Sequence, residues 1–126
     1  MAVVKKLLLL SAAAVSGVAS AELVRRTPYP TKLSALGLVG VSAIYPLARH
    51  GLSVNDGGHV AFGAAAVAMT AVANESIPAR RVVAGGWAAH ALIDLVAGAG
   101  SKSRLPSWYP AACAAYDIGY AARLAM

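Results

Sequence analysis

The chain has 126 residues, of which 59% are hydrophobic and 13% are charged, about half the charged share of roughly 25% that is usual in soluble domains. A soluble protein of this size must cover most of its surface with polar side chains, and the mean hydropathy of +0.64 shows that this chain lacks them. The formal charge of +6 suggests nucleic acid as a partner. No basic stripe alternates with aromatic residues, so nucleic-acid binding is excluded. The basic residues are interpreted as anchors in lipid head groups.

The first apolar stretch covers residues 7–24 and follows the basic pair Lys5 and Lys6. A basic start, an apolar middle and the ending Ala19-Ser20-Ala21 are typical of a secretory signal peptide. The same stretch also has the length of a helix that crosses a bilayer of about 30 Å. Residues 1–24 are therefore predicted to be either a signal peptide or an N-terminal transmembrane helix, and both hypotheses stay open.

Four further apolar runs are predicted to be helices, at residues 33–47, 59–73, 82–98 and 108–124. They are dense in alanine and leucine, show no alternation of period two, and are longer than the roughly 10 residues of a membrane strand. The segments between them contain prolines or glycines and are short, which predicts that successive helices are antiparallel neighbours.

The predicted fold is all-α, an integral membrane up-and-down helical bundle. Its four core transmembrane helices form one domain at residues 33–126, and residues 1–24 add a signal peptide or a fifth helix. The abundance of glycine and alanine suits close packing between membrane helices, within one chain or between the chains of a homo-oligomer. Basic residues occur on both sides of this topology, so the sequence does not predict its orientation.

Four ionisable residues lie inside the last three predicted helices, namely His59, His90, Asp94 and Asp117. Such a side chain costs at least about 2.5–3.5 kcal/mol at the centre of a membrane helix, so all four are expected to face the bundle interior. His90 and Asp117 are both near the middle of antiparallel helices, which predicts one polar layer. Asp94, Cys113 and His59 are predicted to form a second layer nearer one membrane surface.

The spacing of the polar residues predicts that they face one another across the helices. Steps of three or four residues place Trp87, His90 and Asp94 on one stripe. Cys113, Asp117 and Tyr120 form a second stripe on the last helix. Convergence of the stripes predicts a polar pocket that opens toward Asp56 and the loop at residues 101–104.

Within this pocket, His90 is assigned as the proton-transfer group, with Asp94 and Asp117 as the carboxylates that orient it. The predicted binding residues are His59 at the mouth, Trp87, Cys113 and Tyr120.

Histidine, aspartate and cysteine also ligate zinc or iron, but H-x-x-x-D is a weak signal and a di-iron site needs more carboxylates than this chain supplies. No metal and no cofactor are therefore assigned, and a metal site stays open as an alternative reading of the cluster. Tyr45, Trp108, Tyr109 and Tyr116 are interpreted as interface or packing aromatics.

Three functional hypotheses follow from these residues. The first is a pocket that binds or acts on a lipophilic small molecule that enters from the bilayer, with membrane lipids as partners. The second is a non-enzymatic membrane subunit or packing module whose His/Asp cluster only locks the helices. The third is a proton-linked carrier, which would require a dimer of so short a chain. The sequence does not decide whether the protein is an enzyme.

The C-terminal half carries the pattern Trp87-x-x-His90-x-x-x-Asp94, then Pro106-x-Trp108, then Cys113-x-x-x-Asp117, and the segment Tyr45-Pro46-Leu47-Ala48-Arg49 precedes it. In this it resembles a group of small bacterial multi-pass membrane proteins with no established activity. The resemblance implies a four-helix core in the bacterial plasma membrane. Those proteins often have a histidine after the residue equivalent to Asp94, where this chain has Ala97-Gly98-Ala99-Gly100.

Overall fold

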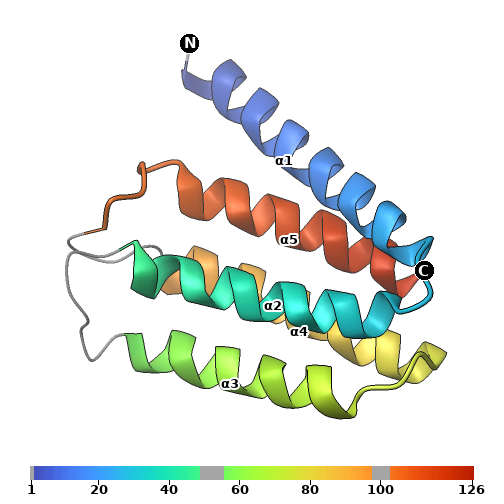
Figure 1. Cartoon of the computed structure of the whole chain (residues 1–126). Coiled ribbons are helices and arrows are strands. Elements are labelled where there is room, and N and C mark those ends of the chain that lie inside the picture. Colours follow the sequence, from blue (N-terminus) through green and yellow to red (C-terminus); the bar gives the residue numbers. More distant parts are fainter. Residues whose placement is uncertain (1, 49–55, 98–102) are drawn as a thin grey trace.

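The computed structural model describes residues 2–48, 56–97 and 103–126, and these form five α-helices and no strand (Figure 1). The helices are α1 (Ala2–Arg25), α2 (Pro30–Leu47), α3 (Asp56–Val72), α4 (Ile77–Ala97) and α5 (Tyr109–Ala125). Successive helices run in opposite directions, up and down the bundle (Figure 1). The predicted all-α helical bundle is confirmed, and each of the five helices contains most of one apolar run of the sequence.

Four helices begin earlier than the predicted apolar runs, and in α2 and α4 this is because proline is compatible with the first turn of a helix. α2 begins at Pro30 instead of residue 33, and α4 begins at Ile77 instead of residue 82. Ser76 caps α4 by accepting a hydrogen bond from the Ala79 N–H at 3.2 Å. Glu75 caps α2 from the neighbouring connection, since its carboxylate accepts the N–H groups of the first turn.

α1 packs along α5 at close range, with glycines at the crossing. A Cβ added at Gly17 would overlap the carbonyl oxygen of Tyr116, and one added at Gly119 would overlap the carbonyl oxygen of Ala14. Only glycine permits backbones to approach this closely, as in other small-residue contacts between helices. Toward the end of α1, Glu22 forms an ion pair with Arg123 of α5. α1 is thus an integral wall of the bundle in this structure.

The remaining helices pack as two close pairs, α2 with α3 and α4 with α5, and α2 also contacts α4. The prediction that all successive helices are close neighbours is wrong for α3 and α4, whose backbones make little close contact over the described residues. The rings of Phe62 and His90 lie between these two helices, with centroids 5.4 Å apart. Gly63 instead faces Ser42, so the close approach of α3 is to α2.

Within the described ranges, α1 (at Val3–Arg25) is the one helix both long and apolar enough to cross a membrane by length and composition. Residues Gly57–Val72 of α3 are apolar but shorter. A terminal helix of this kind is compatible with a membrane span and with a signal sequence. The expected membrane insertion of the four core helices is therefore taken up below as a proposal.

Gly17→Ala and Gly119→Ala are each expected to lower the free energy of unfolding by about 1–3 kcal/mol, because the added methyl group forces α1 and α5 apart. Gly40→Ala and Gly85→Ala are matched controls, since a Cβ at either position meets no atom within 4 Å. The controls are expected to be neutral or to stabilise by about 0.5–1 kcal/mol, because alanine is the better helix former. Denaturant titration in detergent measures the difference, and equal stability of all four variants would contradict this packing.

Candidate functional site

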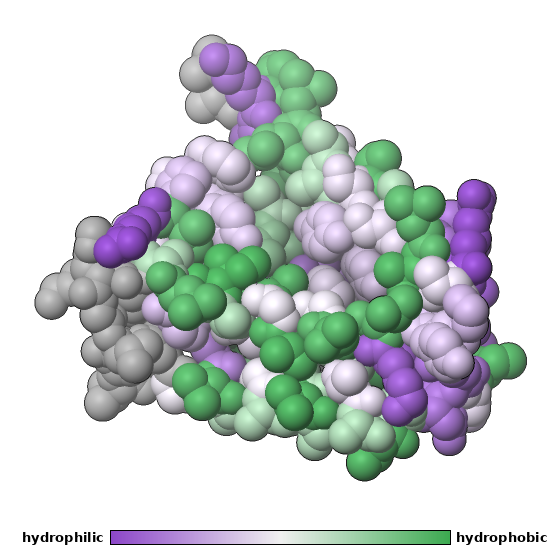
Figure 2. Space-filling model, viewed as in Figure 1, coloured by the Kyte–Doolittle hydropathy of each residue, from purple (hydrophilic) through white to green (hydrophobic). Residues whose placement is uncertain are grey.

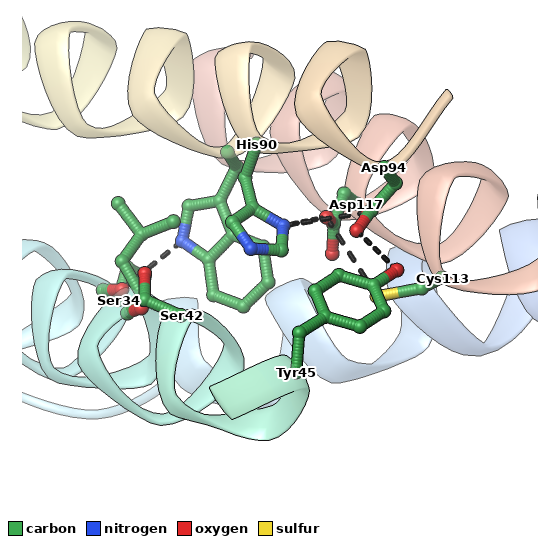
Figure 3. A network of polar contacts seen from close by, with 9 residues as sticks. Ser34, Ser42, Tyr45, His90, Asp94, Cys113 and Asp117 are labelled. Atoms are coloured by element: carbon green, nitrogen blue, oxygen red, sulfur yellow. Dashed lines mark hydrogen bonds and ion pairs between the residues drawn. The ribbon is translucent and has the colours of Figure 1, made fainter. Parts of the chain in front are cut away.

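A cluster of polar side chains lies inside the bundle where α2, α4 and α5 meet (Figure 3). His90 and Asp94 come from α4, one helical turn apart, and Cys113 and Asp117 come from α5 with the same spacing. Tyr45 reaches them from α2. The two i,i+4 pairs of the sequence therefore face each other across the α4–α5 contact.

The imidazole of His90 lies between the two carboxylates. Its Nδ1 atom is hydrogen-bonded to Asp117 Oδ2 at 2.8 Å and lies 3.4 Å from Asp94 Oδ2. The Cys113 Sγ atom approaches the same Asp117 oxygen at 4.0 Å. His90 and Asp117 are 0% exposed and Asp94 is 1% exposed, so water does not screen these contacts.

Tyr45 completes the cluster from the opposite wall. Its hydroxyl donates to Asp94 Oδ1 at 2.6 Å, and its ring stacks on His90 with the centroids 6.5 Å apart. The sequence analysis placed Tyr45 among the packing aromatics. The sequence does contain a signal for its role in the cluster. Tyr45 lies near the end of α2 that the up-and-down topology brings to the level of Asp94.

Several polar atoms of this cluster have no hydrogen-bond partner among the described residues, namely His90 Nε2, Asp94 Oδ2 and Asp117 Oδ1. Two ionised carboxylates beside one imidazolium carry a net charge of −1, and beside a neutral imidazole they carry −2. Buried charge without compensation is costly. The arrangement can therefore hold and transfer a proton, or accept a cation.

The structure brings the predicted catalytic residues together and merges the two expected layers into one cluster. Asp94 and Cys113 reach the level of His90 and Asp117, because carboxylate and thiol side chains bridge one helical turn. His59 lies at the edge, 4% exposed, with its ring centroid 5.0 Å from that of Tyr45.

Trp87 and Tyr120, predicted as binding residues, lie in a separate group around Ser34 of α2. The indole Nε1–H of Trp87 donates to the Ser34 carbonyl oxygen at 3.0 Å, and the Ser34 and Tyr120 hydroxyls are hydrogen-bonded at 2.8 Å. The Trp87 and Tyr120 rings stack with centroids 4.0 Å apart. These contacts join α2, α4 and α5 one to two turns from His90, so the helical stripes continue from the cluster into a packing contact.

An apolar cavity of about 560 Å³ adjoins the cluster between α1, α2 and α5. We call it the groove; its lining residues are Leu9, Ala12, Ala13, Ser16, Val41, Ile44, Trp108, Tyr109, Ala112, Cys113 and Tyr116. Cys113 belongs to both the groove and the cluster. Of the opening predicted at Asp56 and residues 101–104, residues 101–102 and the Asp56 side chain lie outside the described part of the chain.

Comparisons with protein-family models, curated proteins and solved structures found no match for this chain. Functional assignment therefore depends on the cluster and the groove themselves.

Tyr45→Phe is expected to lower the free energy of unfolding by about 1–3 kcal/mol, because it leaves Asp94 Oδ1 buried without its donor. The expected loss would be seen as a lower midpoint in thermal or denaturant unfolding. Tyr29→Phe removes the same hydroxyl from a side chain that is 60% exposed, and should change nothing measurable. Equal stability of both variants would show that the Tyr45–Asp94 hydrogen bond is not formed.

Proposed function

We propose that this chain is a small multi-pass membrane protein that binds a lipophilic small molecule in the groove, with the His/Asp cluster acting on its polar end. The observation that carries the proposal is the position of Cys113. Its side chain lines the apolar groove and lies 4.0 Å from Asp117 in the buried cluster. An apolar cavity that ends at convergent polar and titratable groups is the usual form of a small-molecule site.

Membrane insertion is supported by the distribution of side chains. Large apolar residues are exposed on every helix, including Leu8, Leu36, Val67, Leu95 and Ile118. Ser34, Ser42, His59, His90, Asp94 and Asp117 are buried instead, which is the reverse of a soluble bundle. Figure 2 shows apolar and near-neutral surface over much of the bundle, with strongly hydrophilic residues mostly toward its periphery. Exposed apolar surface on this scale requires a covering, and lipid supplies it.

The helix lengths fit the same proposal. At about 1.5 Å per residue, helices of 17–24 residues are about 25–36 Å long, close to a hydrocarbon core of about 30 Å. Basic residues gather at the end of the bundle where α1 and α5 finish and α2 and α4 begin. These are Arg25, Arg26, Lys32, Arg80, Arg81 and Arg123.

We also infer that α1 stays in the mature protein as a fifth helix. Cleavage after Ala21 would remove the partner of Gly119 and would expose the α5 face that Ala21 covers, where Ala21 itself is 0% exposed. It would also remove Leu9, Ala12, Ala13 and Ser16, which form one wall of the groove.

The groove favours a molecule with one apolar chain and a small polar end. Its lining is mostly apolar, and most of the lining residues that carry a polar atom, including Tyr109, Cys113 and Tyr116, come from α5. Its volume of about 560 Å³ lies within the roughly 300–1,000 Å³ of ligand sites. In this arrangement His90 is the proton-transfer group, and the two aspartates hold its ring.

One observation favours a packing module as the second candidate function. The His90–Asp117 hydrogen bond joins α4 to α5, and interhelical bonds of this kind also serve only to fix helices in membranes, at about 0.6–2 kcal/mol each. This alternative predicts a groove without a saturable ligand.

The chain is expected in the membrane fraction of cells and should resist an alkaline carbonate wash, because its apolar surface lies in lipid. Intact-mass measurement of the purified protein should give a mass that includes residues 2–21. Release by carbonate would contradict membrane insertion. A mass that lacks these residues would contradict retention of α1.

Binding in the groove is tested with a long-chain fatty alcohol that carries a photoreactive diazirine, applied to the full chain in lipid nanodiscs. Labelling of groove residues such as Leu9 and Tyr116 should saturate and be displaced by unlabelled alcohol. Ala12→Phe fills the groove from α1 and should weaken this labelling by about tenfold, the effect of about 1.4 kcal/mol.

The matched control is Ala64→Phe, on the exposed face of α3, which should not change groove labelling. Labelling at Leu92 and Leu95, exposed on α4, reports the general lipid surface and should not saturate. If groove and lipid surface are labelled alike, the binding function is wrong and the packing module is favoured.

A further inference from the structure

We propose that His90, Asp94, Cys113 and Asp117 together bind a divalent transition metal ion of the zinc class. One donor atom from each of the four residues lies within 4.8 Å of the donor atoms of the other three. All four side chains come from the facing surfaces of α4 and α5, so two rigid helices hold the set. No metal was assigned from the sequence, because the H-x-x-x-D spacing is a weak signal and a di-iron site needs more carboxylates. The structure adds the convergence of Asp94 and Cys113 with His90 and Asp117.

The distances suit a tetrahedral site after small side-chain movements. Bonds of about 2.0–2.3 Å to nitrogen, oxygen and sulfur place tetrahedral ligand atoms about 3.4–3.6 Å apart. The His90 Nδ1 atom is 2.8 Å from Asp117 Oδ2 and 3.4 Å from Asp94 Oδ2, and the thiol is 4.0 Å from Asp117 Oδ2. A bound ion would replace the direct His90–Asp117 hydrogen bond with two metal–ligand bonds.

Buried polar atoms point to the same ligand. Asp94 Oδ2 faces His90 yet has no hydrogen-bond donor among the described residues, whereas Oδ1 of the same carboxylate accepts from Tyr45. The Tyr45 hydroxyl thus fixes Asp94 Oδ1, and Asp94 Oδ2 is left to bind an ion. Protein metal sites commonly orient a ligating carboxylate in this way. A dication would offset two of the three negative charges that the two carboxylates and the Cys113 thiolate carry beside a neutral imidazole.

The donor set identifies the class of metal. A thiol and an imidazole are poor ligands for magnesium and calcium, which take oxygen donors. Cysteine, histidine and carboxylate are all zinc ligands. Cys113 binds as the thiolate, so its proton leaves for solvent when the metal–sulfur bond forms.

This site lies at the polar end of the groove, because Cys113 belongs to both. Four protein donors fill a tetrahedral coordination shell, so the ion would join α4 to α5 as closed structural sites do. The metal proposal does not rest on the lipophilic ligand, and its test uses the metal alone. Failure of metal binding therefore leaves groove labelling as a separate result, and the reverse also holds.

The test uses the full chain in detergent, stripped with a chelator and titrated with Co²⁺. We expect one Co²⁺ per chain, a thiolate-to-cobalt charge-transfer band in the near ultraviolet, and loss of that band when Zn²⁺ is added. Cys113→Ser should bind cobalt more weakly and lack the band. Calorimetry in buffers of different ionisation enthalpy should show proton release that is smaller in Cys113→Ser.

Two further variants separate ligands from neighbours. Tyr45→Phe, which leaves all four donors in place, should weaken binding by about 10–100-fold, the usual effect of losing an outer hydrogen bond. Glu22→Gln is the matched control, because it removes a carboxylate that pairs with Arg123 outside the cluster, and it should bind cobalt as the wild type does.

Absence of cobalt binding by the wild type, or a charge-transfer band that persists in Cys113→Ser, would overturn the proposal. The test does not use Asp94→Asn or Asp117→Asn, so it stands even if these variants unfold. The contact of the Cys113 thiol with Asp117 Oδ2, at 4.0 Å, is long and weak, so the serine variant is expected to fold.

Discussion

Asp94 and Asp117 lie beside one histidine, out of reach of solvent, in a bundle built largely of alanine, glycine and leucine. Removing these charges from water is expensive, so the surrounding helices must supply compensating contacts. Tyr45 supplies one from α2, and the His90 ring supplies another from α4. The positions of three helices are therefore tied to one another by the need to satisfy a few polar atoms.

Close backbone packing makes this burial possible. Small residues let α1 approach α5 and let α3 approach α2, so little space is left for water around the centre. A second polar contact, in which Ser34 of α2 meets Trp87 and Tyr120, fixes the same helices at another level. Two separate levels of hydrogen bonding define the rotation of α2 against α4 and α5, which one level alone would not.

Much of this could be predicted from the sequence, because helical spacing and short connections constrain which faces meet. The pairing of His90 with Asp117 follows from their equal depth on antiparallel helices. The reach of a side chain along the helix axis does not follow from spacing, so Asp94 and Cys113 were placed in a separate layer. Tyr45 was expected to be a packing residue and belongs to the cluster, whereas Trp87 was expected to bind and lies in a packing contact. The sequence does not separate these roles, because an aromatic side chain with one polar atom suits both.

The groove links the function of the site to α1. Its walls come from α1, α2 and α5, and the Cys113 thiol lies where the groove meets the cluster. Without α1, the α5 face that includes Cys113 would lie open on the side of the missing wall. A site that depends on a low dielectric would then be weakened together with the binding of any apolar chain. The proposed retention of α1 and the proposed chemistry at His90 therefore depend on the same wall of the groove.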